Sequence, residues 1–306
     1  MTAHSFRIKA ILQAILVTVL WASSWILIKV GLNNNIPPIS FAGLRYGLAW
    51  ICLTPLVLFK PDHRSAIKNF SRTDWLQLGS LGLIFYSFTQ GSQFLGLLYL
   101  PAAMLNLLLN LTPVIVGFLG VAFLNDRPAP TQWFGIGLAT LGVGIYFLPL
   151  SLPKTQVVGL VVGIIGILSN AGSSILGREI NRQKKLSPLV VTFVSMGIGS
   201  LLLLGIGAAT QGFGSLRIRD WAIIVWLAVI NTAFAFTLWN NTLRILTAVE
   251  SSVINSLMMP QIAILAYVFL GETLSIKEIC GLVLVGFGVL IVQIKPRIKL
   301  NQKTYA

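Results

Sequence analysis

Long apolar stretches separated by short polar breaks run along the whole chain of 306 residues. Ten of these stretches have roughly the 20 residues that a helix needs to cross a bilayer core of about 30 Å. They lie at 10–31, 38–58, 75–97, 101–124, 131–149, 157–177, 188–209, 221–243, 246–270 and 276–294. The breaks between them are rich in asparagine and proline, as at residues 33–38. The pattern predicts an all-α integral membrane protein with ten transmembrane helices and no soluble domain.

The composition agrees with lipid as the solvent around most of the chain. Hydrophobic residues make up 56% and charged residues 10%, whereas a soluble domain carries about 25% charged residues. The mean hydropathy is +0.85. Cys52 and Cys280 lie in apolar stretches and His4 and His63 in polar ones, so we expect no disulfide framework, no metal site and no cofactor. These features exclude a soluble enzyme.

The distribution of positive charge predicts how the chain crosses the membrane. A net charge of +14 would suggest nucleic-acid binding in a soluble protein. With a cytoplasmic N-terminus, however, 16 of the 22 lysines and arginines fall in cytoplasmic segments and 4 on the opposite side. Those on the opposite side are Lys154, Arg217, Arg219 and Lys277. The positive-inside rule then predicts a multi-pass protein of the plasma membrane with both termini cytoplasmic, 1–9 at the start and a basic tail at 295–306. We expect the protein to interact with the lipid bilayer and not with nucleic acid.

An internal repeat divides the chain into two halves. Asp74-Trp75 recurs as Asp220-Trp221 after 146 residues, and the same offset relates residues 123–145 to 269–291 through seven identities. Each half, 10–149 and 157–294, holds five predicted spans. Because five is odd, the halves must enter the membrane in opposite directions. The sequence therefore predicts two inverted five-helix repeats, an arrangement that suits alternating access to a central site.

Several motifs resemble those of the drug/metabolite transporter superfamily and its EamA branch. They are Trp21-Ala22-Ser23-Ser24 with Lys29, Phe41-Ala42-Gly43-Leu44-Arg45, Pro260 with Phe269-Leu270-Gly271-Glu272, and the echo Pro113 with Phe123-Leu124-Asn125-Asp126. The likeness covers about residues 10–294. It implies a secondary transporter that moves small metabolites, often amino acids, commonly outward and often against protons. The chain departs from the family pattern at 125–126 and at 170–173, which bears on the substrate rather than the fold.

Three charged side chains inside predicted spans are candidates for function, because a charge costs at least ~2.5–3.5 kcal/mol at the bilayer centre. Arg45 lies roughly 11 Å along its helix and is placed either to bind a substrate carboxylate or to donate to carbonyls between helices. Glu250 is a candidate proton-coupling group, or else stabilises the positive end of its helix. Lys29 lies near the end of its span, where its ammonium can reach the membrane surface.

Prolines and polar side chains within the spans are the other candidates. Pro113 and Pro260 are expected to break their helices, and unwound polar half-helices are where such carriers bind substrate. The candidates for the substrate pathway, besides Arg45, are Trp21, Tyr86, Gln90, Asn106, Asn110, Trp239, Asn240, Ser252 and Asn255. The alternative role for each amide and hydroxyl is a hydrogen bond between packed helices.

The leading expectation is a secondary active transporter that exports amino acids or related small polar metabolites by alternating access, with protons as a candidate coupling ion. The alternative in the same class is an organic-anion or sugar-phosphate exchanger in which Lys29 and Arg45 bind the anion. A membrane-embedded enzyme would need a catalytic cluster that the spans lack, and a polar interior argues against a scaffold protein. We expect no catalytic residues. Glycine pairs such as Gly159 and Gly163 suit close packing within or between subunits, so monomer and homodimer both stay open.

Overall fold

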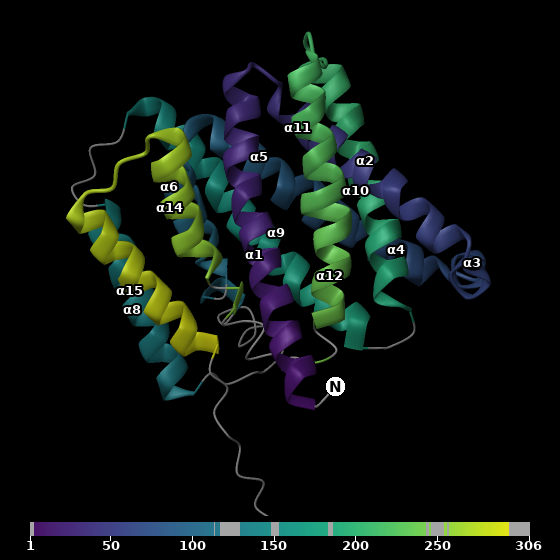
Figure 1. Cartoon of the computed structure of the whole chain (residues 1–306), viewed down its shortest axis with the longest axis horizontal. Coiled ribbons are helices and arrows are strands. Elements are labelled where there is room, and N and C mark those ends of the chain that lie inside the picture. The colour runs from purple at the N-terminus through teal and green to yellow at the C-terminus, as the bar shows by residue number, and fades with distance from the viewer. Residues whose placement is uncertain are drawn as a thin grey trace, which may run out of the picture.

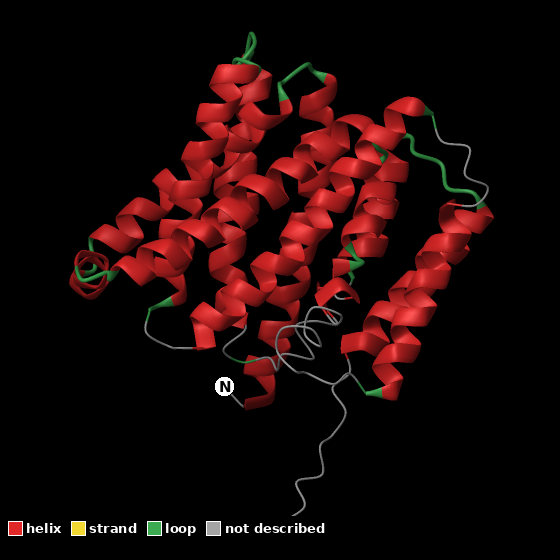
Figure 2. Cartoon of the chain, turned by 180° about the vertical axis from the view of Figure 1, so that it is seen from behind, coloured by secondary structure: helices red, strands yellow, loops and turns green. Residues whose placement is uncertain are grey.

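The computed structural model describes residues 3–112, 114–116, 129–147, 153–182, 186–242, 245, 254–255 and 257–293. Throughout these residues the regular secondary structure is helical, with no strand (Figures 1 and 2). Four helices have the length and apolar composition to cross a membrane, at Ile8–Asn33, Pro38–Leu58, Lys154–Gly177 and Pro188–Thr210. The prediction of a helical membrane protein is confirmed for the described residues, while the total of ten spans stays a prediction.

The helices follow the predicted order in both halves of the chain. The first half holds α1 (Ala3–Asn33), α2 (Pro38–Leu58), α3 (Pro61–Lys68), α4 (Arg72–Leu81), the π-helical segment η1 (Gly82–Thr89), α5 (Gln90–Tyr99), α6 (Ala102–Leu109) and α8 (Pro130–Phe147). The second half holds α9 (Lys154–Arg182), α10 (Pro188–Thr210), α11 (Ile218–Ala228), the π-helical segment η2 (Val229–Phe234), α12 (Ala235–Thr242), α14 (Met258–Leu270) and α15 (Ile276–Gln293).

The short helix α3 lies in a stretch that the sequence analysis treated as a break between spans. Pro61 occupies its first turn together with Asp62, and Lys68 lies in its last turn. These residues suit the two ends of a helix, because proline needs no hydrogen-bond acceptor there and each charge opposes the helix dipole. A search for membrane-length apolar stretches overlooks a polar helix of 8 residues.

Four helices begin with the same kind of cap, and the caps form two pairs related by the offset of the sequence repeat. In each, a backbone N–H donates to the side chain three residues later, which holds the first turn in place. The bonds are Ser71 N to Asp74 at 2.8 Å, Arg217 N to Asp220 at 2.9 Å, Ala129 N to Gln132 at 2.9 Å and Ser275 N to Glu278 at 2.7 Å. The correspondence between the halves thus extends to how these helices start.

The two π-helical segments also lie at corresponding places. Moved by 146 residues, η1 falls on 228–235, which contains η2. A hydroxyl in each segment donates to the carbonyl five residues earlier, Thr89 to Ile84 at 3.0 Å and Thr232 to Leu227 at 2.8 Å. Single π-helical turns inside α-helices are found often at functional sites. The third predicted span of each half therefore carries the same irregularity.

The halves pack through corresponding elements. Helix α2 packs against α10, and α8 against α15, while η1 contacts α9 and α10 and η2 contacts α1 and α2. Each π-helical segment thus packs against the first two long helices of the opposite half. Helices α8 and α15 lie together at one side of the bundle (Figure 1).

Glycines let α8 and α15 approach closely. A Cβ atom on Gly288 would lie 2.5 Å from the backbone nitrogen of Ala139, and one on Gly142 would lie 2.8 Å from the carbonyl oxygen of Gly281. Backbone atoms cannot move aside as the end of a flexible side chain can. The close approach therefore depends on the absence of side chains at these positions.

We expect Gly288→Val to lower the thermal unfolding midpoint of the purified protein, because overpacking of this kind costs about 1–3 kcal/mol. Gly286→Val is the matched control, since a Cβ atom there meets nothing within 4 Å. Thermal unfolding of both variants in detergent checks the prediction. Equal midpoints for the two variants would contradict the packing of α8 on α15.

Candidate functional site

The segment η2 connects the two halves through two consecutive polar residues. Thr232 Oγ1 accepts a hydrogen bond of 3.0 Å from Arg45 Nε on α2. The preceding residue, Asn231, turns to α1, where its Nδ2 donates to Leu20 O and, at 3.1 Å, to Ser23 Oγ. Asn231 and Thr232 are both fully buried. Helices α1 and α2 of the first half are thus held to η2 of the second half by polar contacts inside the bundle.

Arg45 is a buried charge without a carboxylate partner in the described part of the chain. Its side chain is 4% exposed, and its guanidinium carbon lies 5.1 Å from the ring centre of Tyr46 and 6.0 Å from that of Phe94. Aromatic faces stabilise a desolvated cation in part. The bond from Nε is the only hydrogen bond of this guanidinium to a described residue, so its two Nη groups have no such partner. The fork is left free to bind an anionic group.

Two further candidates join Arg45 through a residue that the sequence analysis did not single out. Tyr46 donates its hydroxyl to Gln90 Oε1 at 2.6 Å, and its ring lies 5.6 Å from that of Tyr86, which is 3% exposed. Tyr46 therefore brings the three candidates Arg45, Tyr86 and Gln90 together. In the sequence, Tyr46 is distinguished only by its position directly after Arg45.

Aromatic rings of α1 and α12 form a second group. Trp21 on α1 lies 5.3 Å, between ring centres, from both Phe236 and Trp239 on α12. The candidates Trp21 and Trp239 are thus in contact. Phe236 joins them in the structure, although the apolar pattern of the sequence does not distinguish it from a core residue. The side chain of Asn240 lies outside the described residues.

Four buried polar atoms around α1 have no hydrogen-bond partner among the described residues. They are Trp21 Nε1, Asn106 Nδ2, Asn231 Oδ1 and Gln261 Oε1. The elements that carry the last three, α6, η2 and α14, all pack against α1. Each unsatisfied polar group costs about 1–3 kcal/mol, and native structures contain few of them. Two donors and two acceptors around one helix indicate a polar path that a ligand can complete.

Gln261 was missed by the sequence analysis, which stopped at Pro260. Its Nε2 donates to Thr18 Oγ1 on α1 at 3.2 Å, while its Oε1 has no partner among the described residues. Pro260 itself lies in the first turn of α14, where a missing N–H leaves no bond unmade. Pro260 lies in the middle of the predicted span 246–270, and α14 begins two residues before it.

The asparagines of α6 lie at the end of that helix. Asn110 Nδ2 donates to Asn106 Oδ1 at 3.0 Å. Pro113 has no N–H to donate to the carbonyl of Leu109. That carbonyl instead accepts a hydrogen bond of 2.7 Å from the hydroxyl of Thr112. The same hydroxyl accepts a hydrogen bond of 3.0 Å from Asn170 Nδ2. The end of α6 is thereby tied to α9 of the second half.

The remaining candidates lie elsewhere. Lys29 Nζ donates to the carbonyl of Leu100 at 2.8 Å and to that of Leu97, so its ammonium is engaged at the end of α5. Asn255 is exposed. Glu250, Ser252 and Pro113 lie outside the described residues.

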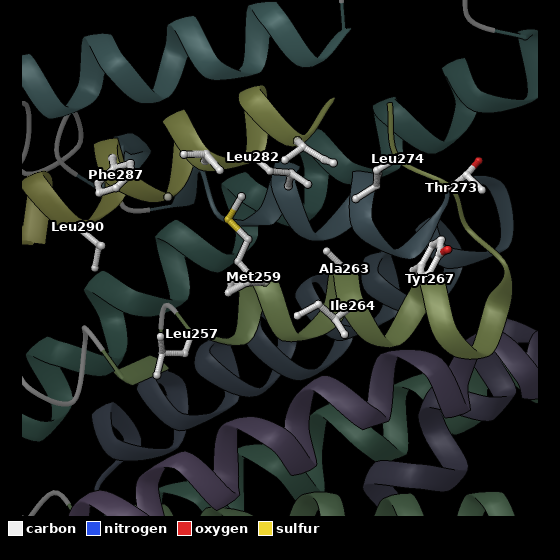
Figure 3. A pocket seen from close by; sticks show the side chains of 14 residues that line it. Leu257, Met259, Ala263, Ile264, Tyr267, Thr273, Leu274, Leu282, Phe287 and Leu290 are labelled. Carbon is white, nitrogen blue, oxygen red and sulfur yellow. The ribbon is translucent and has the colours of Figure 1, made fainter. Parts of the chain in front are cut away.

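A cavity of about 710 Å³ opens between α14 and α15, away from the polar residues described above. Figure 3 shows an apolar lining that includes Met259, Ile264 and Phe287, with the hydroxyls of Tyr267 and Thr273 at one end. Several of its residues are exposed, as expected of helix faces that meet lipid. The residues that line the cavity include no charged group that could bind a polar metabolite.

Comparison with known proteins gives one family and several relatives. The model of the EamA-like transporter family matches residues 8–148 and again residues 157–294. A "Probable amino-acid metabolite efflux pump" of Salmonella typhimurium is 26% identical over 91% of this chain and 92% of its own. A "Probable terminal-alkyne amino-acid exporter" of Streptantibioticus cattleyicolor is 24% identical over 86% of each chain. A solved structure described as "Crystal structure of protein" has a TM-score of 0.65 at 15% identity over 93% of this chain and 97% of its own, which concerns the fold alone.

Proposed function

Because the chain belongs to the EamA-like transporter family, we propose that it is a secondary active transporter that exports amino acids or related small carboxylates by alternating access. The family and the relative from Salmonella typhimurium are named for transport and efflux. The two relatives named for amino-acid efflux motivate the substrate class and the direction.

The single observation that carries the substrate class is the guanidinium of Arg45, whose two Nη groups have no hydrogen-bond partner among the described residues. A carboxylate is planar and has two oxygens, so it matches these two Nη groups as a bidentate pair. A carboxylate stabilises a buried guanidinium with one neutral hydrogen bond more than it stabilises a guanidinium exposed to water. A sugar phosphate would favour more than one cation, and Lys29 is engaged by two carbonyls at the end of α5. The site therefore favours a substrate with one carboxylate.

We place this site between two inverted five-helix halves, with both termini in the cytoplasm of a plasma-membrane protein. The family model matches the chain twice, and the caps and π-helical segments recur at the repeat offset. The packing of η1 and η2 against the opposite halves puts Arg45 and Asn231 where the halves meet. These observations support a substrate site that is exposed alternately to the two sides.

Counterflow in proteoliposomes tests the proposal. We expect labelled amino acids to exchange, and the matching amines, which lack the carboxylate, to exchange far more slowly. Nucleosides and sugar phosphates serve as comparisons. Exchange of the amines at the same rate would contradict the role given to Arg45, and no flux of any substrate through folded protein would contradict transport.

Asn231→Leu is expected to raise the substrate KM about tenfold, which corresponds to one hydrogen bond of about 1.4 kcal/mol. It should also lower the thermal unfolding midpoint, because the bonds from Asn231 Nδ2 to α1 are lost. Leucine has the same number of side-chain heavy atoms with the same branching, and it removes Oδ1, which has no partner among the described residues, together with the amide donor. Ser200→Ala is the control, because Ser200 is also fully buried but its hydroxyl bonds only within its own helix, to Gly197 O. Counterflow kinetics measure both variants, and an unchanged KM for Asn231→Leu would remove this residue from the pathway.

A further inference from the structure

The tight turn between α5 and α6 is held by two charged side chains from distant parts of the chain. Lys29 at the end of α1 donates to the carbonyls of Leu97 and Leu100. On the other side of the turn, the carboxylate of Glu272 accepts backbone N–H groups from Ala102 at 2.8 Å and Ala103 at 3.3 Å. The cation thus binds the last carbonyls of one helix and the anion binds the first N–H groups of the next.

Both charges match the helix ends that they contact. The last carbonyls of a helix carry partial negative charge and the first N–H groups carry partial positive charge, and neither has a partner within the helix. Charge-assisted bonds of this kind are about twice as strong as neutral ones. The two charges also attract each other across the turn. The turn is therefore held more firmly than a neutral cap would hold it.

The conformation of Gly271 brings Glu272 to this turn. Gly271 ends α14 with a φ of 68°, in the left-handed region that favours glycine. The chain then doubles back, and Glu272 N donates to Ala266 O at 3.2 Å. The glutamate side chain is thus presented to α6 by the end of α14 itself.

The contact joins the two halves at one end of the bundle. Lys29, near the end of α1, and the turn belong to the first half, and Glu272, which follows α14, belongs to the second. The last turns of α1 and α14 lie at the end of the bundle remote from the N-terminus (Figure 1). In a carrier with alternating access, a contact that spans the halves at one end must break when that end opens. We infer that Lys29 and Glu272 form a latch that holds this end of the transporter closed. The inference rests on the proposed transport function.

The latch differs from an ordinary ion pair, and the difference can be tested. Each charge is bound to backbone groups of one polarity, so exchanging the two charges would place a carboxylate against carbonyls and an ammonium against N–H groups. The double variant Lys29→Glu with Glu272→Lys should therefore be as open as the single variants. A simple ion pair would be restored by the exchange.

The experiment measures the distance between spin labels at Leu98→Cys and Ile276→Cys, two exposed positions on α5 and α15, in lipid nanodiscs. The native Cys52 and Cys280 are first replaced by serine. In the parent protein we expect a single short distance between the labels. In Glu272→Gln we expect the ratio of long to short distances to rise about fivefold or more, which corresponds to the loss of a helix cap.

Glu278→Gln is the matched control, because Glu278 caps only its own helix by accepting from Ser275 N at 2.7 Å. It should keep the parent distance. The latch is overturned if Glu272→Gln keeps the parent distance, if Glu278→Gln opens the protein equally, or if the charge exchange restores the short distance. Because the labels report without any substrate, an absence of transport would count against the proposed function and leave this test intact.

Discussion

Arg45→Met is expected to slow the exchange of carboxylate substrates about 100-fold while leaving the protein at least as stable as the wild type. Removing one partner of a buried charge pair costs about 2–5 kcal/mol, and 1.4 kcal/mol corresponds to a factor of ten. Methionine has a similar reach and no charge, so the variant also removes the cost of burying an unpaired guanidinium. Loss of function and gain of stability therefore go together if Arg45 serves the substrate.

Two further variants separate the charge from its geometry. Arg45→Lys keeps the charge but loses the planar fork, so we expect it to recover only a small part of the exchange rate. Thr232→Val removes the acceptor of Arg45 Nε and leaves the guanidinium in place, so its effect should be smaller than that of Arg45→Met. Counterflow rates and thermal midpoints of the three variants check these expectations. A large fall in the midpoint of Arg45→Met, with exchange retained, would assign Arg45 to structure.

Glu250→Gln is expected to abolish substrate accumulation driven by a pH gradient and to preserve exchange at equal pH on both sides. Glu250 lies about four residues from the start of the predicted span 246–270, farther inside a span than any other acidic residue. Glutamine keeps the shape of the side chain but can neither gain nor lose a proton, so only the coupled process needs the native residue.

The two assays must be run on the same proteoliposomes. Glu278→Gln again provides the comparison, since Glu278 lies at the start of α15 and caps that helix. Equal accumulation by wild type and Glu250→Gln under a pH gradient would eliminate Glu250 as the coupling group. Loss of exchange at equal pH in Glu250→Gln would point to substrate binding instead.

The apolar pattern predicts the helices well because burial in lipid demands long apolar stretches. The pattern predicts a span that starts at 276, where α15 begins, and a span at 38–58 whose ends are those of α2. The π-helical turns in η1 and η2 escape such an analysis, because a change from i+4 to i+5 bonding alters no residue type. The start of α14 at Met258 is likewise not marked in the sequence, because apolar residues lie on both sides of it.

The sequence predicts those residues of the candidate site that are unusual by themselves. It does not predict those whose role depends on a partner far away in the sequence. Arg45 stands out as a charge in an apolar stretch, and Trp21 and Tyr86 stand out less. Thr232, in contrast, is an ordinary hydroxyl whose importance comes from Arg45, 187 residues away. Gln261 likewise acquires interest only through its contact with Thr18 on α1. Packing across ten apolar stretches decides such contacts, and apolar periodicity does not encode which helix faces meet.

Each π-helical turn inserts one surplus residue into its helix, and this changes the rotational phase of everything that follows. One residue corresponds to about 100° of rotation about the helix axis. The face of α12 that carries Phe236 and Trp239 therefore meets Trp21 only because η2 precedes it. Without the surplus residue, the same sequence would direct both rings to a different neighbour. A single inserted residue thus sets which helix the aromatic face contacts.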